Sequence, residues 1–482
     1  MGKKINNHCN GFALWKYDFH DHPMQKERKK YRKIYYLLFK EMLSKLVGEH
    51  QVHDVLVKKL KVSLRLTNFD LSPIPFERLC EEFSSKIFWH GGFSWGWIDH
   101  RILLLIETAT LAWCFNDKIE KSMIDSYGKM LHIEDDEMVF IDKYVNRISI
   151  GNNEIGKIRM KNHSTDRERA LNYLKKQWKK EYERKQKPQY NVAICATMSS
   201  GKSTVMNALL GNNIFPFGNR ACTAKIISFE DDPEQEKIIG GKKAIDGRIY
   251  YEEIKDDVLE LWNEENVDSR IYLTGNIEGI NSQGRNLCLY DTPGTNSSQN
   301  AIHEDMTKKL LEETTIDTVL YVCNAEQAGT TDEAYFLKWL KKNIVDKKSV
   351  EIIFIVNKFD SVDIESENPI EFLAQINDNL KQIGFENIIL IPISAGAACL
   401  FRMALRGEPM TKKSKLDLKK YYNYFVEMNQ DFRKLIKVNY LGGDNKDVNV
   451  TDASGMNLLK AIEYTGITVL EKILEQRVKG EV

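Results

Sequence analysis

The stretch CATMSSGKST, from Cys195 to Thr204, carries the strongest structural signal in the chain. An apolar run before it, Tyr190–Ala196, predicts a buried strand, and the residues after it predict a helix over Lys202–Leu210 that ends at Gly211. A strand, a loop of small residues and a helix are typical of a phosphate-binding loop, whose backbone N–H groups point at phosphate oxygens. Ala196 replaces the usual first glycine of G-x-x-x-x-G-K-[ST], so the assignment of a phosphate-binding loop needs further evidence from the rest of the chain.

Three further segments follow apolar runs that we expect to be strands. DTPG, Asp291–Gly294, ends one run, and an aspartate there can hold Mg²⁺ through water. NKFD, Asn357–Asp360, ends another, and its last carboxylate can accept two hydrogen bonds from guanine, whereas adenine offers no such pair. ISAG ends the next run, where the Ala395 N–H is expected to contact the guanine oxygen. Four such segments in this order predict a guanine-nucleotide site at the carboxyl ends of the strands.

The residue types within these segments suggest individual roles. Lys202 is expected to reach the β- and γ-phosphates, and Ser203 and Asp291 are expected at the Mg²⁺ ion. The Gly294 N–H can sense the γ-phosphate, and the stem of Lys358 can pack over the base. The other residues expected to line the nucleotide are Met198, Ser200, Gly201, Thr204, Asn357, Asp360 and Ser394.

The sequence changes texture at Pro188, where apolar runs begin to alternate with helical segments. Such runs suit parallel strands that are buried on both faces, and their alternation with helices predicts right-handed crossovers. Residues 188–482 are therefore expected to form an α/β P-loop GTPase domain with a doubly wound, mainly parallel sheet. A helical insertion rich in Lys and Tyr is expected over Lys412–Tyr440, within the region near 400–440, and a last helix over Gly455–Glu475.

Residues 1–163 are expected to form an N-terminal all-helical domain, because strand signals are few and apolar residues recur at helical spacing. Pro23 predicts the start of a long helix. Further helices are expected over Asp99–Phe115, Lys118–Leu131 and Asp135–Val145. A charged connecting helix is expected over Ser164–Gln186, within residues 164–187, because acidic residues lie near its start and lysines near its end, as the helix dipole favours.

Composition limits the classes of partner and the compartment. Among 482 residues, 69 Lys and Arg balance 69 Asp and Glu, which argues against nucleic acid as a partner. The eight cysteines include no C-x-x-C pair and indicate buried thiols in a reducing compartment. No signal peptide is visible, and the longest apolar tract, Ile102–Phe115, is too short to cross a bilayer. We therefore expect a cytoplasmic protein, with peripheral membrane association left open. The pairs His20/His22 and His50/His53 lack metal-ligand companions and are interpreted as ordinary histidines.

Taken together, TMSSGKST, CTAKI, DTPGTNSS and NKFD resemble the dynamin superfamily, and its bacterial dynamin-like members in particular, over roughly Gln189–Gln476. The resemblance implies hydrolysis of GTP to GDP and phosphate, accelerated when two G domains meet as a homodimer, with Mg²⁺ and in some members a monovalent cation. It also implies that Thr223 is the switch threonine that closes on Mg²⁺ and the attacking water, and that Ser199 occupies the position of a catalytic serine. Met198 stands where classical dynamins carry glutamine, which places that part of their mechanism in doubt.

Several questions stay open at this level. Arg220 lies three residues before Thr223, the spacing of an internal arginine finger, so it competes with the loop and a cation for charge compensation. One functional hypothesis is an enzyme that acts at membranes; the alternative is a soluble GTP-gated switch whose helical domain binds a protein partner. An RNA-associated GTPase is less favoured, because the net charge is zero and no RNA-binding module is recognisable. The apolar spacing around FNDKI resembles small TerB-type helical domains.

Overall fold

The computed structural model divides the chain into two compact units. The helical unit is Met1–Lys187 with Lys243–Tyr251, and the sheet unit is Pro188–Lys242 with Glu252–Val482. The described residues are 17, 19–47, 54–67, 72, 74–85, 96–116, 119–150, 172–179, 182–183, 187–197, 199–215, 225–233, 235, 237–243, 249–254, 258–264, 270–282, 284–294, 301–327, 331–363, 368–436 and 456–480. The division of the chain into domains at 1–163, 164–187 and 188–482 stays a prediction.

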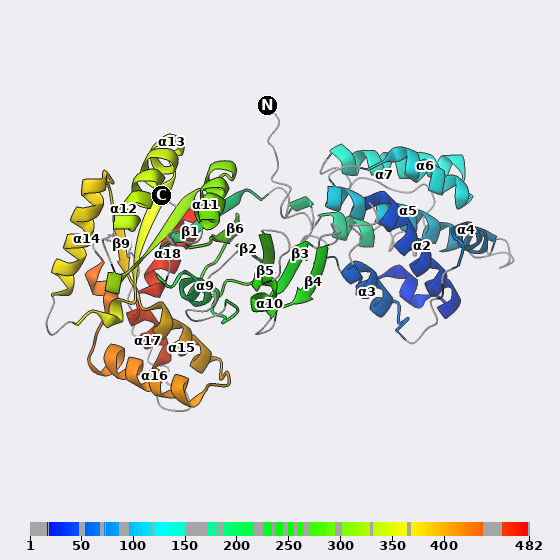
Figure 1. Ribbon diagram of the computed structural model, residues 1–482. Helices are drawn as coiled ribbons and strands as arrows, with labels where there is room; N and C mark the ends of the chain where they lie inside the picture. The colour runs from blue at the N-terminus through cyan, green and yellow to red at the C-terminus, as the bar shows by residue number, and fades with distance from the viewer. Residues whose placement is uncertain are drawn as a thin grey trace. The chain divides into compact units, whose positions relative to one another are not determined.

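Apart from Lys243 and residues 249–251, which belong to strands, the described part of the helical unit is built mainly from helices, as Figure 1 shows. They are η2 (Pro23–Lys26), α2 (Lys29–Val47), α3 (Asp54–Ser63), α4 (Phe76–Ser85), α5 (Gly96–Asn116), α6 (Lys121–Met130) and α7 (Asp135–Ile150). Residues 172–179 are also helical, and they are the longest described part of the predicted connecting helix. The helices predicted between Asp99 and Val145 are confirmed as α5, α6 and α7.

Pro23 does not open the long helix that the sequence suggested. It starts the 3-10 turn η2, and the main helix α2 begins only at Lys29. His22 caps η2, because its Nδ1 accepts a hydrogen bond from the Met24 N–H at 3.1 Å. The fixed φ of proline suits the first turn of either kind of helix, so proline alone does not distinguish a 3-10 turn from an α-helix.

Helix α5 is the central helix of this unit and packs against α2 and α7. Its buried apolar side chains are Ile102, Leu103, Leu104, Leu105, Ile106, Ala109, Leu111, Ala112, Trp113 and Cys114. A helix with apolar residues all round belongs in a core. Two charged side chains are buried with them: Arg101, which donates to the Leu131 carbonyl at the end of α6, and Glu107, which is 0% exposed.

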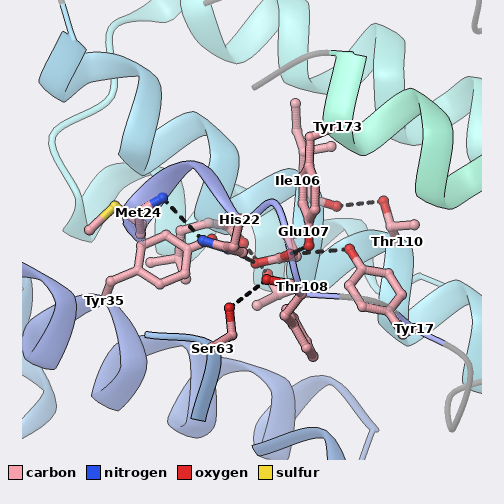
Figure 2. Close-up of polar contacts among 12 residues, drawn as sticks. Tyr17, His22, Met24, Tyr35, Ser63, Ile106, Glu107, Thr108, Thr110 and Tyr173 are labelled. Atoms are coloured by element: carbon pink, nitrogen blue, oxygen red, sulfur yellow. Dashed lines mark hydrogen bonds and ion pairs between the residues drawn. The ribbon is translucent and has the colours of Figure 1, made fainter. Parts of the chain in front are cut away.

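Glu107 lies at the centre of a buried polar cluster, which Figure 2 shows. Its Oε1 accepts hydrogen bonds from the hydroxyls of Tyr17 at 3.2 Å and Tyr173 at 3.0 Å. Its Oε2 accepts from the Tyr35 hydroxyl at 2.7 Å and from Nε2 of His22 at 3.1 Å. The cluster therefore joins the N-terminal segment, α2, α5 and the 172–179 helix through one carboxylate.

The hydrogen bonds of His22 settle the charge of this cluster. Because Nδ1 accepts the Met24 N–H, the ring proton sits on Nε2 and the imidazole is neutral. The donors around Glu107 thus compensate one negative charge without a cation. Burial, and then the charge of Glu107, raise the pKa of Tyr17, Tyr35 and Tyr173 well above its usual value, so that these hydroxyls remain donors.

Most of a nine-stranded sheet, in the order β4-β3-β5-β2-β6-β1-β7-β8-β9, belongs to the sheet unit. The strands are β1 (Gln189–Ala196), β2 (Ile226–Asp231), β3 (Ile239–Lys243), β4 (Ile249–Glu253), β5 (Arg270–Gly275), β6 (Asn286–Asp291), β7 (Thr318–Asn324), β8 (Glu351–Asn357) and β9 (Ile389–Pro392). The pairs from β6 through β1, β7 and β8 to β9 are parallel, whereas β2 runs antiparallel to β6 and β3 antiparallel to β5. The predicted mainly parallel α/β sheet is confirmed.

Helices accompany this sheet in two groups (Figure 1). The α-helices are α9 (Lys202–Leu210), α10 (Val258–Glu264), α11 (Ala301–Glu313), α12 (Thr331–Leu340), α13 (Asp346–Lys348), α14 (Pro369–Ile383), α15 (Ala395–Leu405), α16 (Lys412–Tyr422), α17 (Leu458–Tyr464) and α18 (Ile467–Lys479). The short helices are η5 (Ala325–Gln327), η6 (Lys341–Val345), η7 (Phe359–Ser361), η8 (Asn423–Glu427) and η9 (Phe432–Leu435). In one group α9, α15, α17 and α18 pack together, and in the other α12 packs against α14.

The sequence predicted one last helix over Gly455–Glu475, and this is wrong. The structure has two helices, α17 and α18, separated at Gly466. Gly466 has φ +83°, and a Cβ there would lie 2.3 Å from the carbonyl oxygen of Pro392 in β9. The backbone must therefore turn and approach the sheet closely at this point, which only glycine permits.

Two expectations about the environment of the chain can be compared with the structure. The cysteines in the described ranges are all buried: Cys80, Cys114, Cys195, Cys288, Cys323 and Cys399. Within those ranges, none of the helices combines the length and the apolar content that crossing a bilayer requires.

Candidate functional site

The loop between β1 and α9 has the backbone shape of an anion-binding turn. Ser199 has φ +61° and Gly201 has φ +87°, so two residues in a run of three are left-handed. Non-glycine residues at positive φ are uncommon, and such backbone conformations align N–H groups toward an anion. The loop leads directly into Lys202, the first residue of α9, and the free N–H groups at a helix N-terminus favour an anion.

Asn357 holds this loop in place from the end of β8. Its Nδ2 donates to the Ser200 carbonyl at 3.0 Å, and its Oδ1 accepts from the Ala395 N–H at 3.2 Å. A Cβ on Gly201 would lie 2.3 Å from this Nδ2, so the glycine is needed for space as well as for its φ. Asn357 therefore braces the loop and the start of α15. The predicted contact of the Ala395 N–H with the guanine oxygen stays a prediction, and it would have to share or replace this hydrogen bond.

The start of α9 places a buried positive charge at the end of β1. Lys202 is 8% exposed. Burial, and then the charge of Lys202, lower the pKa of His303 on α11, so the imidazole favours its neutral form. Burial raises the pKa of the Cys195 thiol to about 12, although Lys202 opposes this shift, so the thiol next to the loop is no nucleophile. Around the lysine, Ser200 Oγ donates to the Thr197 carbonyl at 2.8 Å and Cys399 Sγ to the Thr204 carbonyl at 3.5 Å.

The end of β6 brings a carboxylate to the same edge of the sheet. Asp291 pairs in register with Ile194 of β1 and is 0% exposed. The next residue, Thr292, donates from Oγ1 to the Ile194 carbonyl at 2.8 Å, which fixes this strand end beside the loop. Gly294, expected to sense the γ-phosphate, is also buried here.

The chemistry of these groups fits a magnesium ion. Ser203, at the start of α9, and Asp291, at the end of the strand beside β1, offer the oxygen ligands that Mg²⁺ prefers. In the described part of the chain, no group of three or more His, Cys, Asp or Glu side chains could hold a metal by itself. An ion at this position would therefore also depend on phosphate oxygens.

Three residues of the predicted site lie outside the described residues. They are Met198 in the phosphate loop, the expected switch threonine Thr223, and Arg220. Their roles stay predictions.

The segment predicted to recognise the base, Asn357–Asp360, begins at the last residue of β8 and continues into a tight turn. Lys358 has φ +58°, and its Nζ lies 3.3 Å from Oε2 of Glu326, an exposed ion pair. Phe359 is fully buried and anchors the turn. Burial raises the pKa of Asp360, whereas a side-chain hydrogen bond from Ser394 and the charge of Lys420 lower it. The carboxylate is thus withdrawn from water with incomplete compensation, which is frequent at ligand-binding sites.

Sequence reasoning missed several side chains that the fold brings to this site. Glu326 lies two residues after the end of β7, and its position just after a predicted strand was a usable signal. His303, Lys420 and Tyr421 belong to no motif, because their proximity to Lys202 or Asp360 depends on how α11 and α16 pack.

Part of the sheet unit is similar to known proteins. Residues 192–359 match the model of the dynamin family. An uncharacterized protein in the xynA 3′ region of Caldicellulosiruptor sp. (strain Rt8B.4) is 28% identical over 246 residues, which are 49% of this chain and 56% of that protein. The chain thus matches a little over half the length of this curated relative.

Solved structures show more distant likenesses. A bacterial dynamin pair, described as oligomerised and as a mechanism for the long-range sensing and tethering of membranes, has a TM-score of 0.36 and 15% identity, over 95% of this chain and 73% of that one. Era from Aquifex aeolicus bound to GDP·AlF4⁻ has a TM-score of 0.25 and 18% identity, over 46% of this chain and 57% of that one. These likenesses are too distant to support a statement about activity.

Proposed function

Because residues 192–359 match the model of the dynamin family, we propose that this chain binds GTP with Mg²⁺ and hydrolyses it to GDP and phosphate. The observation that carries the proposal is the convergence of strand ends. Asn357 joins the phosphate loop at Ser200 to the segment at Ala395, and the strands β6, β1, β7, β8 and β9 all run parallel. Parallel strands present their carboxyl ends at one edge, where α/β folds bind nucleotides.

The chemistry proposed for the phosphate end is positioning and charge neutralisation. Loop N–H groups between Thr197 and Ser203 would bind phosphate oxygens, and Lys202 would stabilise charge on the β- and γ-phosphates. A Mg²⁺ ion held through Ser203 and Asp291 would supply further charge neutralisation. Gly294 would donate its N–H to the γ-phosphate. Ser199 and Thr223 would orient the attacking water, as the family resemblance implies.

At the base end, we propose that Asp360 selects guanine. Its ionised carboxylate accepts N–H bonds from the ring nitrogen and from the 2-amino group, and adenine would leave a partly buried charge without these donors. Ser394 and Ala395 start α15 beside it. Lys358 would cover the base while its ammonium group pairs with Glu326.

We further propose that two copies of the chain meet through this domain and that hydrolysis accelerates on contact, with Arg220 or a monovalent cation as alternative sources of positive charge. A membrane-associated action follows the family resemblance. The alternative function is a GTP-gated switch that binds a protein partner through the helical unit. One observation favours it: Tyr173, in the chain segment that leads into β1, is anchored at Glu107 inside the helical unit.

The test is GTP turnover per enzyme at rising protein concentration, with and without vesicles of phosphatidylcholine and phosphatidylglycerol. We expect a rate per enzyme that rises with concentration, and a Lys202→Ala variant slower by about 100-fold or more, because it lacks the main phosphate cation. Stimulation by the anionic vesicles would support action at membranes, and indifference to them would favour the switch. Folded protein with no affinity for GTP or GDP in the presence of Mg²⁺ would refute the proposed function.

A further inference from the structure

Helix α16 lies at the edge of the sheet unit in Figure 1, and none of its residues is buried. Its partly buried side chains are Ser414, Asp417, Leu418, Tyr421 and Tyr422. Its exposed side chains are five lysines and one leucine: Lys412, Lys413, Lys415, Leu416, Lys419 and Lys420. The face that this helix turns to solvent is therefore positive throughout, apart from one apolar side chain.

The leucine lies at the centre of these lysines. Residues three and four apart are neighbours on the surface of a helix. The positions three and four residues before and after Leu416 are all lysines: Lys412, Lys413, Lys419 and Lys420. Leu416 is 69% exposed. A single exposed leucine needs no explanation, but one that is surrounded by cations on one helix face forms a defined surface. We call Leu416 and the five lysines the lysine patch.

The lysine patch is not neutralised within the fold. Lysines on other helices pair with a glutamate four residues away: Lys45 with Glu41 at 3.2 Å. In the same way Lys308 pairs with Glu304 at 2.6 Å. Among the described residues, none of the five lysines of α16 forms such an ion pair. Because the whole chain has no net charge, the patch is a local concentration of positive charge.

The arrangement of the lysines weakens the helix by itself. Lys412 and Lys413 occupy the first turn of α16, where the helix dipole disfavours cations and where no acidic residue is present. Lys415 and Lys419 are four residues apart, so their like charges repel each other. Binding of an anionic partner would relieve both costs, which indicates that the patch serves an interaction and not the stability of the fold.

The residue types in the patch distinguish between kinds of anionic partner. Clusters of about four to eight basic residues on a helix are typical of binding to anionic lipid headgroups. Lysine stems can lie along an apolar surface while the ammonium groups stay at the headgroups, and an apolar side chain among them can enter the acyl boundary. Nucleic acids are read mainly by arginine, asparagine, glutamine and stacked aromatic rings, and none of these is exposed on α16. A lipid surface is the better match.

We propose that the lysine patch of α16 is a contact surface for the anionic headgroups of a lipid bilayer, with Leu416 inserted among them. The inference deepens the membrane-associated action proposed above and rests on that part of the proposed function. Most of the contact is electrostatic, so it weakens as the salt concentration rises.

The test is co-sedimentation of the full chain with vesicles of phosphatidylcholine alone and of phosphatidylcholine with phosphatidylglycerol. The patch variant combines Lys412→Gln, Lys413→Gln and Lys419→Gln. Lys420 is retained, because its charge lowers the pKa of Asp360 in the proposed nucleotide site. The matched control removes three exposed lysines from α12, η6 and α13 of the same unit and therefore changes the net charge equally: Lys338→Gln, Lys342→Gln and Lys347→Gln.

We expect the wild-type protein to bind the anionic vesicles, to bind them less tightly as salt rises, and not to bind the neutral vesicles. The patch variant should bind about 100-fold more weakly, because each lysine near an anionic surface contributes about fivefold. The control variant should stay within about twofold of the wild type. Leu416→Ser should weaken binding by about threefold to tenfold, whereas Leu261→Ser, at another exposed leucine, should not.

GDP affinity in the absence of vesicles should be the same in all these variants, because none of the replaced residues belongs to the proposed nucleotide site. Equal vesicle binding by the patch and control variants would overturn the inference and leave action at membranes to another surface. Wild-type protein that does not bind anionic vesicles would overturn this inference and the membrane-associated part of the proposed function, whereas GTP hydrolysis is measured separately. If the patch variant kept vesicle binding but lost affinity for an RNA oligonucleotide, the patch would bind nucleic acid and the inference would be wrong.

Discussion

Glu107 in the helical unit and Asp360 in the sheet unit are both carboxylates withdrawn from water, but their surroundings differ. Glu107 is 0% exposed and accepts hydrogen bonds from Tyr17, Tyr35, Tyr173 and His22, all within its own unit. Asp360 lies at a strand end, and burial raises its pKa even though Ser394 and Lys420 act against the shift. Donors within the fold fill the hydrogen-bonding positions of Glu107, whereas the charge of Asp360 is compensated only in part and could still be paired with a ligand. We therefore interpret Glu107 as a structural carboxylate and propose Asp360 as a binding one, because the two differ in the compensation of their charge more than in their burial.

The two carboxylates should therefore affect different properties of the protein. The pKa of Asp360 is raised in the folded state, so its ionised form weakens the fold at neutral pH, and this cost disappears as the pH falls through that pKa. Replacing Asp360 should leave stability equal or slightly higher, but should damage nucleotide binding. Replacing Glu107 should do the reverse, because four donors would lose their acceptor.

The largest expected effect is on stability, from Glu107→Ala. Removing the acceptor leaves buried tyrosine hydroxyls and the His22 N–H without a partner and opens a cavity in α5, so the free energy of unfolding should fall by about 3–5 kcal/mol. Denaturant unfolding followed by tryptophan fluorescence measures this, and Trp113 and Trp178 report from the same unit, 6.3 Å apart.

The exposed Glu81 on α4 provides the control, because Glu81→Ala should change the free energy of unfolding by no more than about 0.5 kcal/mol. Glu107→Gln retains the shape of the side chain and should fall between the two variants, which keeps the prediction testable if the alanine variant does not fold. A Glu107→Gln protein as stable as the wild type would contradict the interpretation of this cluster as structural.

The next effect in size is on base recognition, from Asp360→Asn. The amide cannot accept both N–H bonds of guanine, so GDP affinity should fall by about 100-fold, as expected for the loss of hydrogen bonds to a charged acceptor. An amide can instead donate to the second carbonyl of xanthine, so XDP affinity should rise relative to GDP. Isothermal titration calorimetry with both nucleotides measures the exchange, and the melting temperature of the nucleotide-free protein should not fall. Unchanged GDP affinity would remove Asp360 from the site.

A third variant tests the hydrogen bond by which Asn357, at the end of β8, holds the phosphate loop at Ser200. Gly201→Ala places a methyl group 2.3 Å from Asn357 Nδ2 in a backbone with φ +87°. Gly384→Ala is the matched control, because its φ is +106° but nothing lies within 4 Å of the added Cβ. Both should lose about 1–2 kcal/mol of stability from backbone strain, but only Gly201→Ala should also lose at least about tenfold in GDP affinity, through the displaced Asn357 bond to Ser200. Equal GDP affinities in the two variants would contradict the bracing role of Asn357.

The sequence was sufficient to predict structure where a local motif and the topology of the sheet point to the same arrangement. The helix Lys202–Leu210 and its end at Gly211 follow from the loop motif and the glycine cap, and the structure has the same bounds. Placement at the ends of parallel strands then explains why Asp291 and Asn357 lie near the loop. The predicted roles of these residues in binding remain to be tested.

Other features depend on contacts between distant segments and leave no local pattern. The break at Gly466 arises from its approach to Pro392 in β9, and a lone glycine in an apolar helical pattern does not announce it. In the sequence, Glu107 is visible only as an interruption of an apolar tract. Its four donors come from positions 17 to 173, so their convergence could not be predicted from spacing. The same holds for Tyr421 beside Asp360.

The smallest predicted effect is a pH dependence that only the sheet-unit carboxylate should produce. Burial raises the pKa of Asp360 above that of an ordinary aspartate, which is about 3.9, so on acidification it takes up a proton earlier. In the proposed site guanine would bind the ionised form, because a protonated carboxyl cannot accept both N–H bonds. GDP affinity should therefore be full at neutral pH and should begin to decline, on acidification, at a higher pH than an ordinary aspartate would produce. Fluorescence titration of the protein with GDP at a series of pH values measures the decline.

Phosphate protonation also weakens binding, and the Asp360→Ala variant isolates that contribution, because it retains the phosphate loop and lacks the carboxylate. If wild type and Asp360→Ala lost affinity in parallel, the titrating group would be on the nucleotide, and the contrast between a saturated and an available carboxylate would have no functional consequence at this site.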